Sequence, residues 1–587
     1  MNITEFLTKN TKRFPQKASV GFKKDNEWKE LTWMRFKQMV FRTANALVEV
    51  GVKENDKIAI YADNSPEWII MDLAALAVGA VTVPVYSTNG TDQVEYILNH
   101  AEPKIILTGD QDQYEICHQL LRKTSSVKII IAAKKNFALK DRSFFLADFI
   151  EKSSDKFKIV ERSDDDLATI IYTSGTSGTP KGVMLTHGNF QKAFDAHQEF
   201  FDFEDFEKEH SLAFLPLSHV FERSWTLLCL YFGAKVSFLE NPKLIANALQ
   251  EVKPTTMCSV PRFYQKIYAG INEMLVTASP TKKKIFNWAI ETGTQVSERK
   301  RNQQKVPFLL NQKYKIANAL VFDKIKTKLG GRLWFMPCGG ASVSVEVTQF
   351  FDAMGIHITV GYGMTETTAT ITAFPFTKYK YGTAGKLIGD SQIKIGENDE
   401  ILVKGSGIMK GYYENPEETA KIFTEDGWMK TGDAGVLDNE GNLTITDRIK
   451  DLMKTSNGKY IAPQPIENMF SNNSYINQIM LIAEDKPFVS ALIVPNFETL
   501  EEKIKTMGIT FTNWKEVLEN EKVQQFYHQL IDGIQTNLSG FEKIKKFVLM
   551  PADFEIQSGE ITPTLKIKRN IVLEKYADKI NSIYNKY

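Results

Sequence analysis

Short apolar runs alternate with amphipathic stretches over the first third of the chain. The runs are rich in β-branched residues, which is typical of buried strands, and the stretches between them repeat their apolar positions with helical spacing. The expected elements are a strand at 57–61, a helix at 66–78, a strand at 81–86, a helix at 91–99, a strand at 104–108, a helix at 112–121 and a strand at 127–132. This alternation predicts an α/β fold with parallel-rich sheets covered by helices. Apolar runs at 212–217 and 332–337 predict two further strands.

Length and composition limit the possible classes of protein. At 587 residues the chain is too long for one hydrophobic core, so two or more domains are expected. Its 43% hydrophobic and 24% charged residues are typical of a soluble globular protein, and the net charge of +1 argues against a nucleic-acid binder. Four widely spaced cysteines are expected to be reduced and buried, without a zinc site: Cys117, Cys229, Cys258 and Cys338.

No segment is expected to cross a membrane or to act as a secretory signal. The most hydrophobic stretch is 68–86, but Asp72 interrupts it and Gly79 and Pro84 punctuate it. A buried helix followed by a buried strand fits this pattern better than a membrane span. The expected location is therefore the cytoplasm.

A loop rich in hydroxyl groups and glycine follows the apolar run at 167–171. Residues 172–183 read Tyr-Thr-Ser-Gly-Thr-Ser-Gly-Thr-Pro-Lys-Gly-Val and lead into an expected return strand at 183–186. Glycines let backbone N–H groups turn inward, and hydroxyls add donors, so this loop predicts a phosphate cradle and not a flexible linker. It lacks the Gly-Lys-Ser/Thr ending of a Walker A loop. Its candidate ligands are Thr173, Ser174, Gly175, Thr176, Ser177, Gly178, Thr179 and Lys181.

The loop resembles the signature loop of adenylate-forming enzymes, which include acyl- and aryl-CoA synthetases, luciferases and the adenylation domains of peptide synthetases. Further motifs follow in the family's order over nearly the whole chain, which is most similar to long-chain fatty-acyl-CoA synthetases. The resemblance implies a large N-terminal domain at 1–448, a small mobile α+β domain at 449–587, and a hinge between them at Lys450.

The motifs that follow the loop suit a nucleotide, and the resemblance gives them roles. Glycines at a strand end let a flat ring lie on backbone, and the family places adenine at such a turn, here Gly339, Gly340 and Ala341. In 360–367, the aromatic ring of Tyr362 suits adenine, the hydroxyl of Thr365 the α-phosphate, and the carboxylate of Glu366 a Mg²⁺ ion. Gly363 and Met364 complete that turn, and Thr173 is a second expected metal ligand.

The C-terminal motifs complete the implied site. Asp433 and Arg448 match the family's ribose-binding residues, and Gly458, Lys459 and Tyr460 match the loop that faces coenzyme A. Lys566 occupies the place of the catalytic lysine, with Lys568 as the competing candidate.

His219 is expected to lie where a strand ends and a helix begins. A histidine beside apolar residues is by default structural, but in α/β sheets this position favours a site role. The matching histidine of the family lies between the acyl pocket and the reacting carboxylate. Trp225 is a weaker candidate for a gate of the acyl tunnel, because its spacing from His219 differs from that in relatives.

A basic segment at 282–332 departs from the composition of the rest. It contains 13 Lys and Arg against 3 Asp and Glu, with aromatic and aliphatic residues between them. A solvated helical hairpin and a peripheral contact with anionic membrane, where a fatty acid is delivered, are equally favoured interpretations.

The parts together predict ATP-dependent activation of a long-chain fatty acid to acyl-adenylate, followed by transfer to CoA with release of AMP and pyrophosphate. The expected small molecules are ATP, Mg²⁺, CoA and fatty acid, with no nucleic acid. One alternative is a fatty-acyl-AMP ligase that loads an acyl carrier protein. An alternative from another class is a non-catalytic nucleotide-binding membrane scaffold, which the complete set of site residues argues against.

Overall fold

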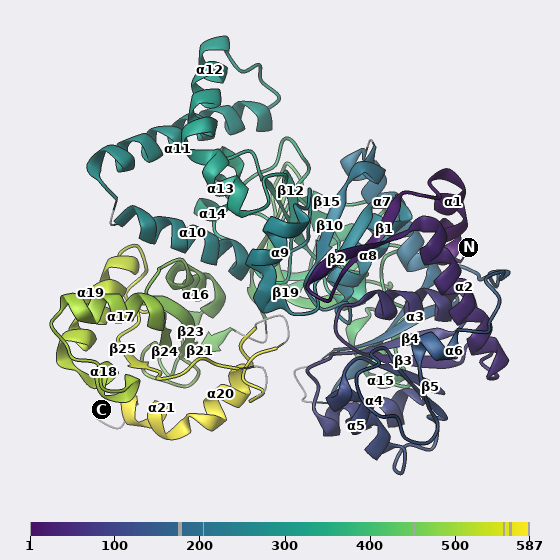
Figure 1. The fold of residues 1–587 in the computed structure, drawn as a ribbon. Coiled ribbons are helices and arrows are strands. Elements are labelled where there is room, and N and C mark those ends of the chain that lie inside the picture. The colour runs from purple at the N-terminus through teal and green to yellow at the C-terminus, as the bar shows by residue number, and fades with distance from the viewer. Residues whose placement is uncertain are drawn as a thin grey trace.

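The computed structural model describes residues 2–173, 179–203, 205–276, 278–449, 452–555, 558–562 and 566–584. Figure 1 shows a large part built from the N-terminal three quarters of the chain and a smaller part, coloured green to yellow, built from its C-terminal end. The architecture is mixed α/β, as the sequence predicted.

The largest sheet of the described residues has eight strands in the order β18-β9-β8-β4-β3-β5-β6-β7. The strands are β3 (Lys57–Tyr61), β4 (Val81–Val85), β5 (Ile105–Thr108), β6 (Ile129–Ala132), β7 (Ser143–Phe145), β8 (Leu167–Thr173), β9 (Lys181–Thr186) and β18 (Gly411–Tyr412). From β8 through β4 and β3 to β7 every pairing is parallel, whereas β8–β9 and β9–β18 are antiparallel. The predicted return strand after the loop is therefore confirmed.

Helices cover both faces of this sheet. Ile58 and Ile60 of β3 belong to one buried apolar cluster, and Ala59 and Tyr61 belong to another, because successive strand side chains point to opposite faces. The first cluster includes residues of α2 (Trp33–Glu49), α3 (Pro66–Ala77), α7 (His187–Phe201) and α8 (Val220–Tyr231). The second includes residues of α4 (Thr91–Ala101) and α5 (Gln111–Leu120). The helix and strand predicted at 68–86 are thus buried core elements, as expected.

Further sheets complete the large part. One contains β10 (His210–Ala213), β11 (Lys235–Phe238), β1 (Ala18–Lys24) and β2 (Glu27–Thr32); a second contains β12 (Phe335–Cys338), β13 (His357–Tyr362), β14 (Thr372–Ala373) and β15 (Lys386–Leu387). Thr256 bridges β10 to β12. A third sheet contains β16 (Gln392–Ile395), β17 (Glu400–Lys404), β19 (Met429–Leu437) and β20 (Leu443–Arg448). The remaining helices here include α1 (Phe6–Arg13), α6 (Leu146–Phe149), α9 (Ile245–Val252), α14 (Val345–Ala353) and α15 (Pro416–Ile422).

The strand predicted at 212–217 ends at Ala213, so the prediction was wrong for its last four residues. Beyond that point the backbone bonds to side chains in place of a neighbouring strand. Leu215 N–H donates to the Glu222 carboxylate at 3.0 Å, and Leu217 N–H donates to Asn64 Oδ1 at 2.9 Å. These bonds turn the chain out of the sheet toward His219.

A buried guanidinium ties α8 to the central sheet. Arg223 and Asp72 of α3 are both fully buried, and the guanidinium donates from Nε and Nη2 to the two carboxylate oxygens at 3.1 and 2.6 Å. The same guanidinium donates to the hydroxyls of Thr82 in β4 and Thr169 in β8 at 2.8 and 2.7 Å. Its Nε and both terminal nitrogens therefore donate hydrogen bonds, and one residue fixes α8 against two strands and a helix.

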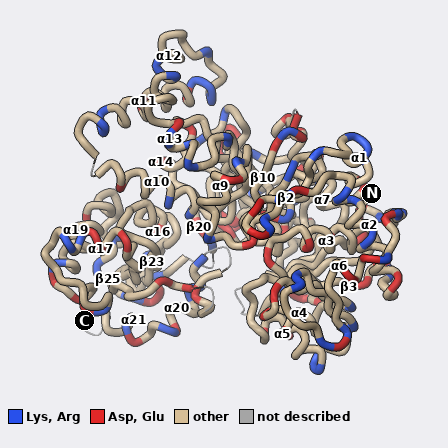
Figure 2. The backbone as a smooth tube through the Cα atoms, viewed as in Figure 1, with Lys and Arg blue, Asp and Glu red and all other residues tan. Residues whose placement is uncertain are grey.

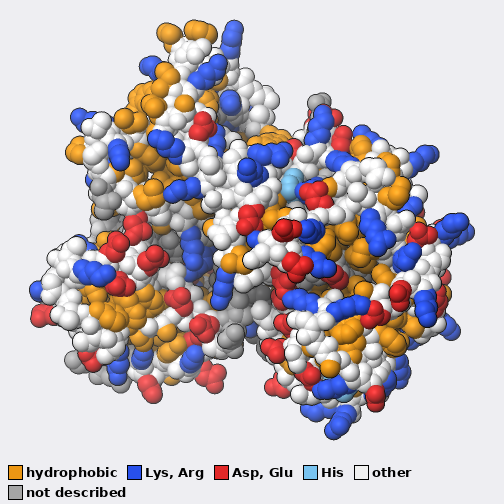
Figure 3. Space-filling model, in the orientation of Figure 1, with side chains coloured by type: hydrophobic (Ala, Val, Ile, Leu, Met, Phe, Trp, Pro, Cys, Tyr) orange, Lys and Arg blue, Asp and Glu red, His pale blue; other side chains and the backbone are white. Residues whose placement is uncertain are grey.

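The basic segment is helical, which is compatible with both interpretations of 282–332. It follows α10 (Pro261–Val276) and contains α11 (Pro280–Arg301), α12 (Phe308–Ala317), a π-helical turn at Asn318–Phe322 and α13 (Asp323–Lys328). In Figure 1 the end that carries α12 projects from the rest of the large part. Figure 2 marks basic positions along α11 and α12, and Figure 3 shows hydrophobic side chains beside them.

The small part is α+β. Its sheet contains β23 (Ile476–Ile482), β24 (Ser490–Pro495) and β25 (Lys546–Leu549), and a hairpin pairs β21 (Met453–Lys454) with β22 (Tyr460–Ile461). Its helices are α16 (Pro463–Ser471), α17 (Phe497–Thr506), α18 (Trp514–Glu519), α19 (Glu521–Ile534), α20 (Arg569–Lys575) and α21 (Ala577–Tyr584). Two apolar clusters of its own fill it. The division at 448/449 stays a prediction.

The sequence predicted neither a membrane-spanning helix nor a disulfide bond, and the structure bears on both points for the described residues only. No helix there is both long and apolar enough to cross a bilayer. The four cysteines are buried free thiols.

Candidate functional site

The two arms of the loop, β8 and β9, are neighbouring strands of the central sheet. Thr173 of β8 pairs directly with Lys181 of β9, and Thr179 is exposed between them. The candidates Ser174, Gly175, Thr176, Ser177 and Gly178 lie outside the described residues. The antiparallel arms therefore hold the ends of the loop together, as a phosphate cradle requires.

Lys181 already has partners at the mouth of the loop. Its ammonium pairs with the carboxylate of Glu418 in α15, and it lies 5.2 Å from the centre of the Tyr412 ring. Tyr412 belongs to β18, which extends the sheet next to β9. Tyr412 and Glu418 were not predicted from the sequence. A usable signal was the helix start Asn415-Pro416-Glu417-Glu418 directly after Gly411-Tyr412.

Glu366 lies in a tight turn after β13. The turn needs glycine at position 363, because a side chain there would come within 2.1 Å of the carbonyl oxygen of Ala369. The Glu366 carboxylate is buried and accepts a hydrogen bond from the Tyr412 hydroxyl at 2.8 Å. Burial raises its pKa, while the hydrogen bond from Tyr412 acts in the opposite direction. Thr365 is buried beside it, and Met364 is half-buried.

The expected ribose and adenine residues lie together. Tyr362 donates its hydroxyl to Asp433 Oδ2 at 2.8 Å, and Arg448 Nε donates to Asp433 Oδ1 at 3.1 Å. Asp433 and Arg448 are direct cross-strand partners in β19 and β20. A carboxylate held by a phenol and a guanidinium is a fixed acceptor, which suits vicinal hydroxyl groups.

The second glycine turn lies close to the start of α8. Gly340 has φ of +87°, a conformation that favours glycine, and Ala341 follows it. A Cβ on Gly339 would lie 3.5 Å from the ring of Phe221, which is two residues after His219. The turn and His219 therefore border the same space.

His219 is the N-cap of α8, and its Nδ1 accepts the Phe221 N–H at 3.1 Å. The proton of the neutral ring is therefore on Nε2, which is left as a donor. Burial, and then the charge of Lys566, lower the pKa of His219 to about 4. The charge of Lys566, the expected catalytic lysine of the small part, therefore reaches this histidine of the large part.

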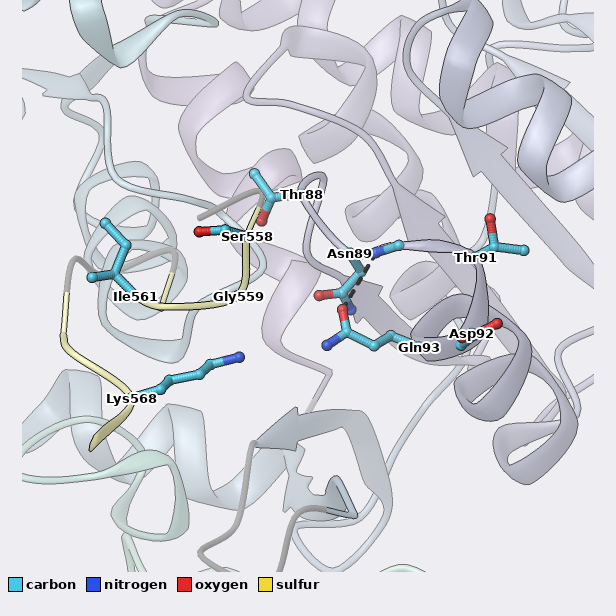
Figure 4. Close-up of a pocket in the computed structure, with 10 residues that line it drawn as sticks. Thr88, Asn89, Thr91, Asp92, Gln93, Ser558, Gly559, Ile561 and Lys568 are labelled. Atoms are coloured by element: carbon cyan, nitrogen blue, oxygen red, sulfur yellow. Dashed lines mark hydrogen bonds between the residues drawn. The ribbon is translucent and has the colours of Figure 1, made fainter. Parts of the chain in front are cut away.

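Lys568 lines a cavity between the two parts. The cavity has a volume of about 590 Å³, with residues 88–93 before and within α4 on one side and Ser558, Gly559 and Ile561 on the other. Figure 4 shows the Lys568 side chain extending into it. The two candidate lysines therefore differ in surroundings: the charge of Lys566 affects the pKa of His219, and Lys568 lines the cavity, while the choice between them stays a prediction.

Side-chain hydrogen bonds between described residues also join the parts elsewhere. Arg262 donates to Asn477 Oδ1 at 2.7 Å, and Asn468 donates to Ser342 Oγ at 2.5 Å. Such small polar contacts are easily exchanged for water, which suits parts that move relative to each other. The expected hinge, Lys450, lies outside the described residues.

The expected CoA-facing residues occupy the hairpin turn between β21 and β22. Gly458 has φ of +78°, and Tyr460 is 61% exposed. Lys454 lies 5.6 Å from the centre of the Tyr460 ring. Lys459 is exposed as well. This turn is open to a large ligand.

Trp225 is buried, and its indole N–H donates to Ser211 Oγ at 3.0 Å. The role of a gate, which the sequence favoured only weakly, stays a prediction.

The oxygen donors of Glu366 and Thr173 are of the kind that binds Mg²⁺ in an enzyme with a phosphate substrate. Within the described ranges no group of three or more His, Cys, Asp or Glu side chains could hold a metal. Mg²⁺ keeps several waters and binds through one or two carboxylates plus substrate phosphates, so the single carboxylate of Glu366 and the hydroxyl of Thr173 are a suitable set.

Comparison with known proteins decides the family. The model for AMP-binding enzymes matches residues 7–413, and the model for the AMP-binding enzyme C-terminal domain matches residues 450–587. The chain belongs to the AMP-binding enzymes.

The relatives of this AMP-binding enzyme cover nearly its whole length. It is 32% identical to long-chain-fatty-acid–CoA ligase FadD15 of Mycobacterium bovis, over 96% of this chain and 93% of that protein. It is also 32% identical to the peroxisomal long chain acyl-CoA synthetase 6 of Arabidopsis thaliana, over 94% and 81%. Among solved structures, the anthranilate CoA ligase AuaEII in complex with anthranoyl-AMP has a TM-score of 0.76 at 16% identity, over 99% and 98%. The fold is therefore that of adenylate-forming enzymes.

Replacing Glu366 by Gln is expected to preserve the fold and to remove most of the adenylation activity. A neutral amide is a poorer Mg²⁺ ligand than a carboxylate, and we expect a loss of at least about tenfold. The measurement is the rate of acyl-adenylate formation over a titration of Mg²⁺. Tyr412→Phe, which removes only the hydroxyl donor to Glu366, is the control and should lose less. Wild-type turnover of Glu366→Gln at limiting Mg²⁺ would overturn the assignment.

Proposed function

We propose that this AMP-binding enzyme is a long-chain fatty acid–CoA ligase. It converts a fatty acid and ATP to acyl-adenylate and pyrophosphate, and then transfers the acyl group to CoA with release of AMP. The observation that carries the proposal is the gathering of Tyr362, Asp433 and Arg448 in one hydrogen-bonded group, with Lys566 of the small part near His219. The names of the relatives supply the acyl substrate class and the acceptor.

In the first half-reaction a carboxylate oxygen of the fatty acid attacks the α-phosphorus of ATP. A new P–O bond forms, the bond to the leaving oxygen breaks, and pyrophosphate departs with the electron pair. Negative charge gathers at the α-phosphate, so the ammonium of Lys566 and the hydroxyl of Thr365 are suited to stabilise it. Glu366 and Thr173 would hold Mg²⁺, which supplies positive charge to the phosphate oxygens.

Neutral His219 suits the approach of the carboxylate. Its Nε2–H can donate to a carboxylate oxygen, and at neutral pH the ring adds no charge of its own. Each oxygen of the Asp433 carboxylate accepts one hydrogen bond and keeps a second acceptor site, so the carboxylate can hold the ribose hydroxyls and thereby position the α-phosphate.

In the second half-reaction the thiol of CoA attacks the acyl carbonyl carbon. The thioester C–S bond forms, the bond to the adenylate oxygen breaks, AMP leaves, and the thiol proton passes to solvent. Lys566 must withdraw to make room for the thiol, which a rotation of the small part about Lys450 accomplishes. The turn at Gly458, Lys459 and Tyr460 then faces CoA.

An enzyme that loads an acyl carrier protein is the less favoured alternative, because the relatives are named as CoA ligases. A non-catalytic scaffold is less favoured still, because Lys181, Glu366, Asp433, Arg448 and Lys566 are all retained.

A panel of acids from short to very long, assayed for AMP release with CoA, tests the function. We expect AMP and acyl-CoA to form in equal amounts and fastest with long chains. AMP release that is independent of the acid, or that requires a carrier protein, would contradict the proposal.

Single-turnover assays should separate the half-reactions. Lys566→Ala should lose adenylation yet still convert a supplied acyl-adenylate to thioester, because its charge serves only the first step. Lys450→Pro should do the reverse, because a fixed φ restricts the rotation that the second step needs. Lys568→Ala is the control, because it also removes one positive charge, two residues from Lys566. If Lys568→Ala loses adenylation and Lys566→Ala does not, Lys568 has the role. Equal damage to both halves by Lys566→Ala would contradict the two-conformation mechanism.

A second proposal concerns location: the enzyme is cytoplasmic and contacts anionic membrane through the basic segment 282–332. Large apolar side chains are exposed there among the lysines, with Phe308 at 73% and Leu309 at 75%. They belong to α12, at the projecting end in Figure 1. Basic residues combined with exposed apolar ones are typical of surfaces that rest on lipid headgroups.

The enzyme should therefore bind anionic vesicles in a salt-sensitive way. Each Lys near such a surface contributes about 1 kcal/mol, so replacing the three lysines at 282–284 by Gln should weaken co-sedimentation markedly. The charge-matched control replaces the exposed Lys152, Lys156 and Lys158 by Gln. If binding is absent at low salt, unaffected by salt, or equally reduced by both triple variants, the segment is only a solvated surface.

A further inference from the structure

Glu418 is paired with Lys181, the residue to which the proposed function assigns the binding of ATP phosphates. Its carboxylate pairs with Lys181 through one oxygen and with Lys421 through the other. The side chain of Lys181 is 20% exposed and that of Glu418 is 29% exposed, so both remain accessible from the mouth of the loop. Phosphate oxygens that approach Lys181 therefore meet a carboxylate already bound to it.

The position of Glu418 is fixed by the fold. α15 begins at Pro416, and the side chain of Asn415 accepts the Glu418 N–H at 3.1 Å. Thr419 fastens the helix to β18, because its hydroxyl accepts the Tyr412 N–H at 2.9 Å. β18 is itself paired with β9, the strand that begins with Lys181. The ion pair thus joins two elements that the sheet holds in register.

β18 and α15 together contact both Lys181 and Glu366, the expected metal ligand. Tyr412 of β18 donates to Glu366, and its ring lies under the ammonium of Lys181. Hydrogen bonds from Lys181 and then Lys421 lower the pKa of Glu418 to about 2, so its carboxylate is charged at neutral pH. β18 and α15 therefore bring a permanent negative charge to the place where a polyphosphate must bind.

We propose that Glu418 is an internal counterion of Lys181 that polyphosphate must displace, and that it thereby sets the affinity of the site for ATP and pyrophosphate. Glu418 is a positioning residue and takes no part in bond making. The proposal rests on the proposed function, because it requires Lys181 to bind phosphate.

The Glu418 carboxylate weakens phosphate binding in two ways. It occupies the ammonium that a phosphate oxygen would otherwise bind, and it repels the phosphates directly. When pyrophosphate leaves, the carboxylate returns to Lys181 and helps to release the product. A weaker hold on ATP is thus accompanied by a weaker hold on pyrophosphate.

Glu418→Gln tests the proposal, since the amide keeps the shape and an acceptor oxygen but removes the charge. We expect the KM for ATP and the inhibition constant for pyrophosphate to fall together by about three- to fivefold, the range of a partly exposed ion pair. The KM values for fatty acid and CoA should stay within about twofold, which is the scatter of changes at surface positions away from a ligand. The matched control is Glu417→Gln, an exposed neighbour that loses the same charge and should change none of these constants.

A double variant shows whether Glu418 acts through Lys181. In a Lys181→Met background, Glu418→Gln should no longer lower the KM for ATP, because methionine has no ammonium for which carboxylate and phosphate could compete. An unchanged or higher KM for ATP in Glu418→Gln, or an equal effect of Glu417→Gln, would overturn the inference while leaving the function intact. An unchanged KM for ATP in Lys181→Met would instead overturn the assignment of Lys181 to phosphate.

Discussion

The buried guanidinium of Arg223 fixes the parts of the site relative to one another. A charge without access to water needs hydrogen-bond partners, and here the guanidinium donates to Asp72 and to the hydroxyls of Thr82 and Thr169. Thr169 belongs to the strand that leads into the phosphate loop, and Arg223 belongs to the helix that begins after His219. One residue therefore fixes the helix that follows His219 against the strand that leads to Thr173.

The remaining charges are divided between the two parts of the molecule. The large part holds Asp433, Glu366 and Lys181 on paired strands and tight turns, where their positions do not depend on the small part. The small part contributes lysines to the interface between the parts. In the proposed mechanism, this division keeps substrate binding constant while the lysine of the first step is brought in and removed.

Much of the central sheet could be predicted from the sequence, because strands such as 57–61 and the helix after Pro66 carry their periodicity and caps locally. The end of the strand at 212–217 could not, because the side chain of Asn64, distant in the sequence, takes the backbone donor of Leu217. Tyr412 and Glu418 were missed for the same reason. Their partners are defined only when β18 pairs with β9, and no local pattern encodes that pairing. The motif resemblance gave the nucleotide residues, and the structure brings Tyr362, Asp433 and Arg448 together; their roles stay predictions.

The central claim is that the fatty acid carboxylate attacks the α-phosphorus of ATP. Turnover of a fatty acid labelled with oxygen-18 in its carboxylate, with ATP and CoA, tests it most directly by mass spectrometry of the products. The account predicts one labelled oxygen atom in AMP, because the oxygen that forms the anhydride leaves with the adenylate when the thiol attacks. Unlabelled AMP, or label in inorganic phosphate with ADP as the nucleotide product, would contradict it.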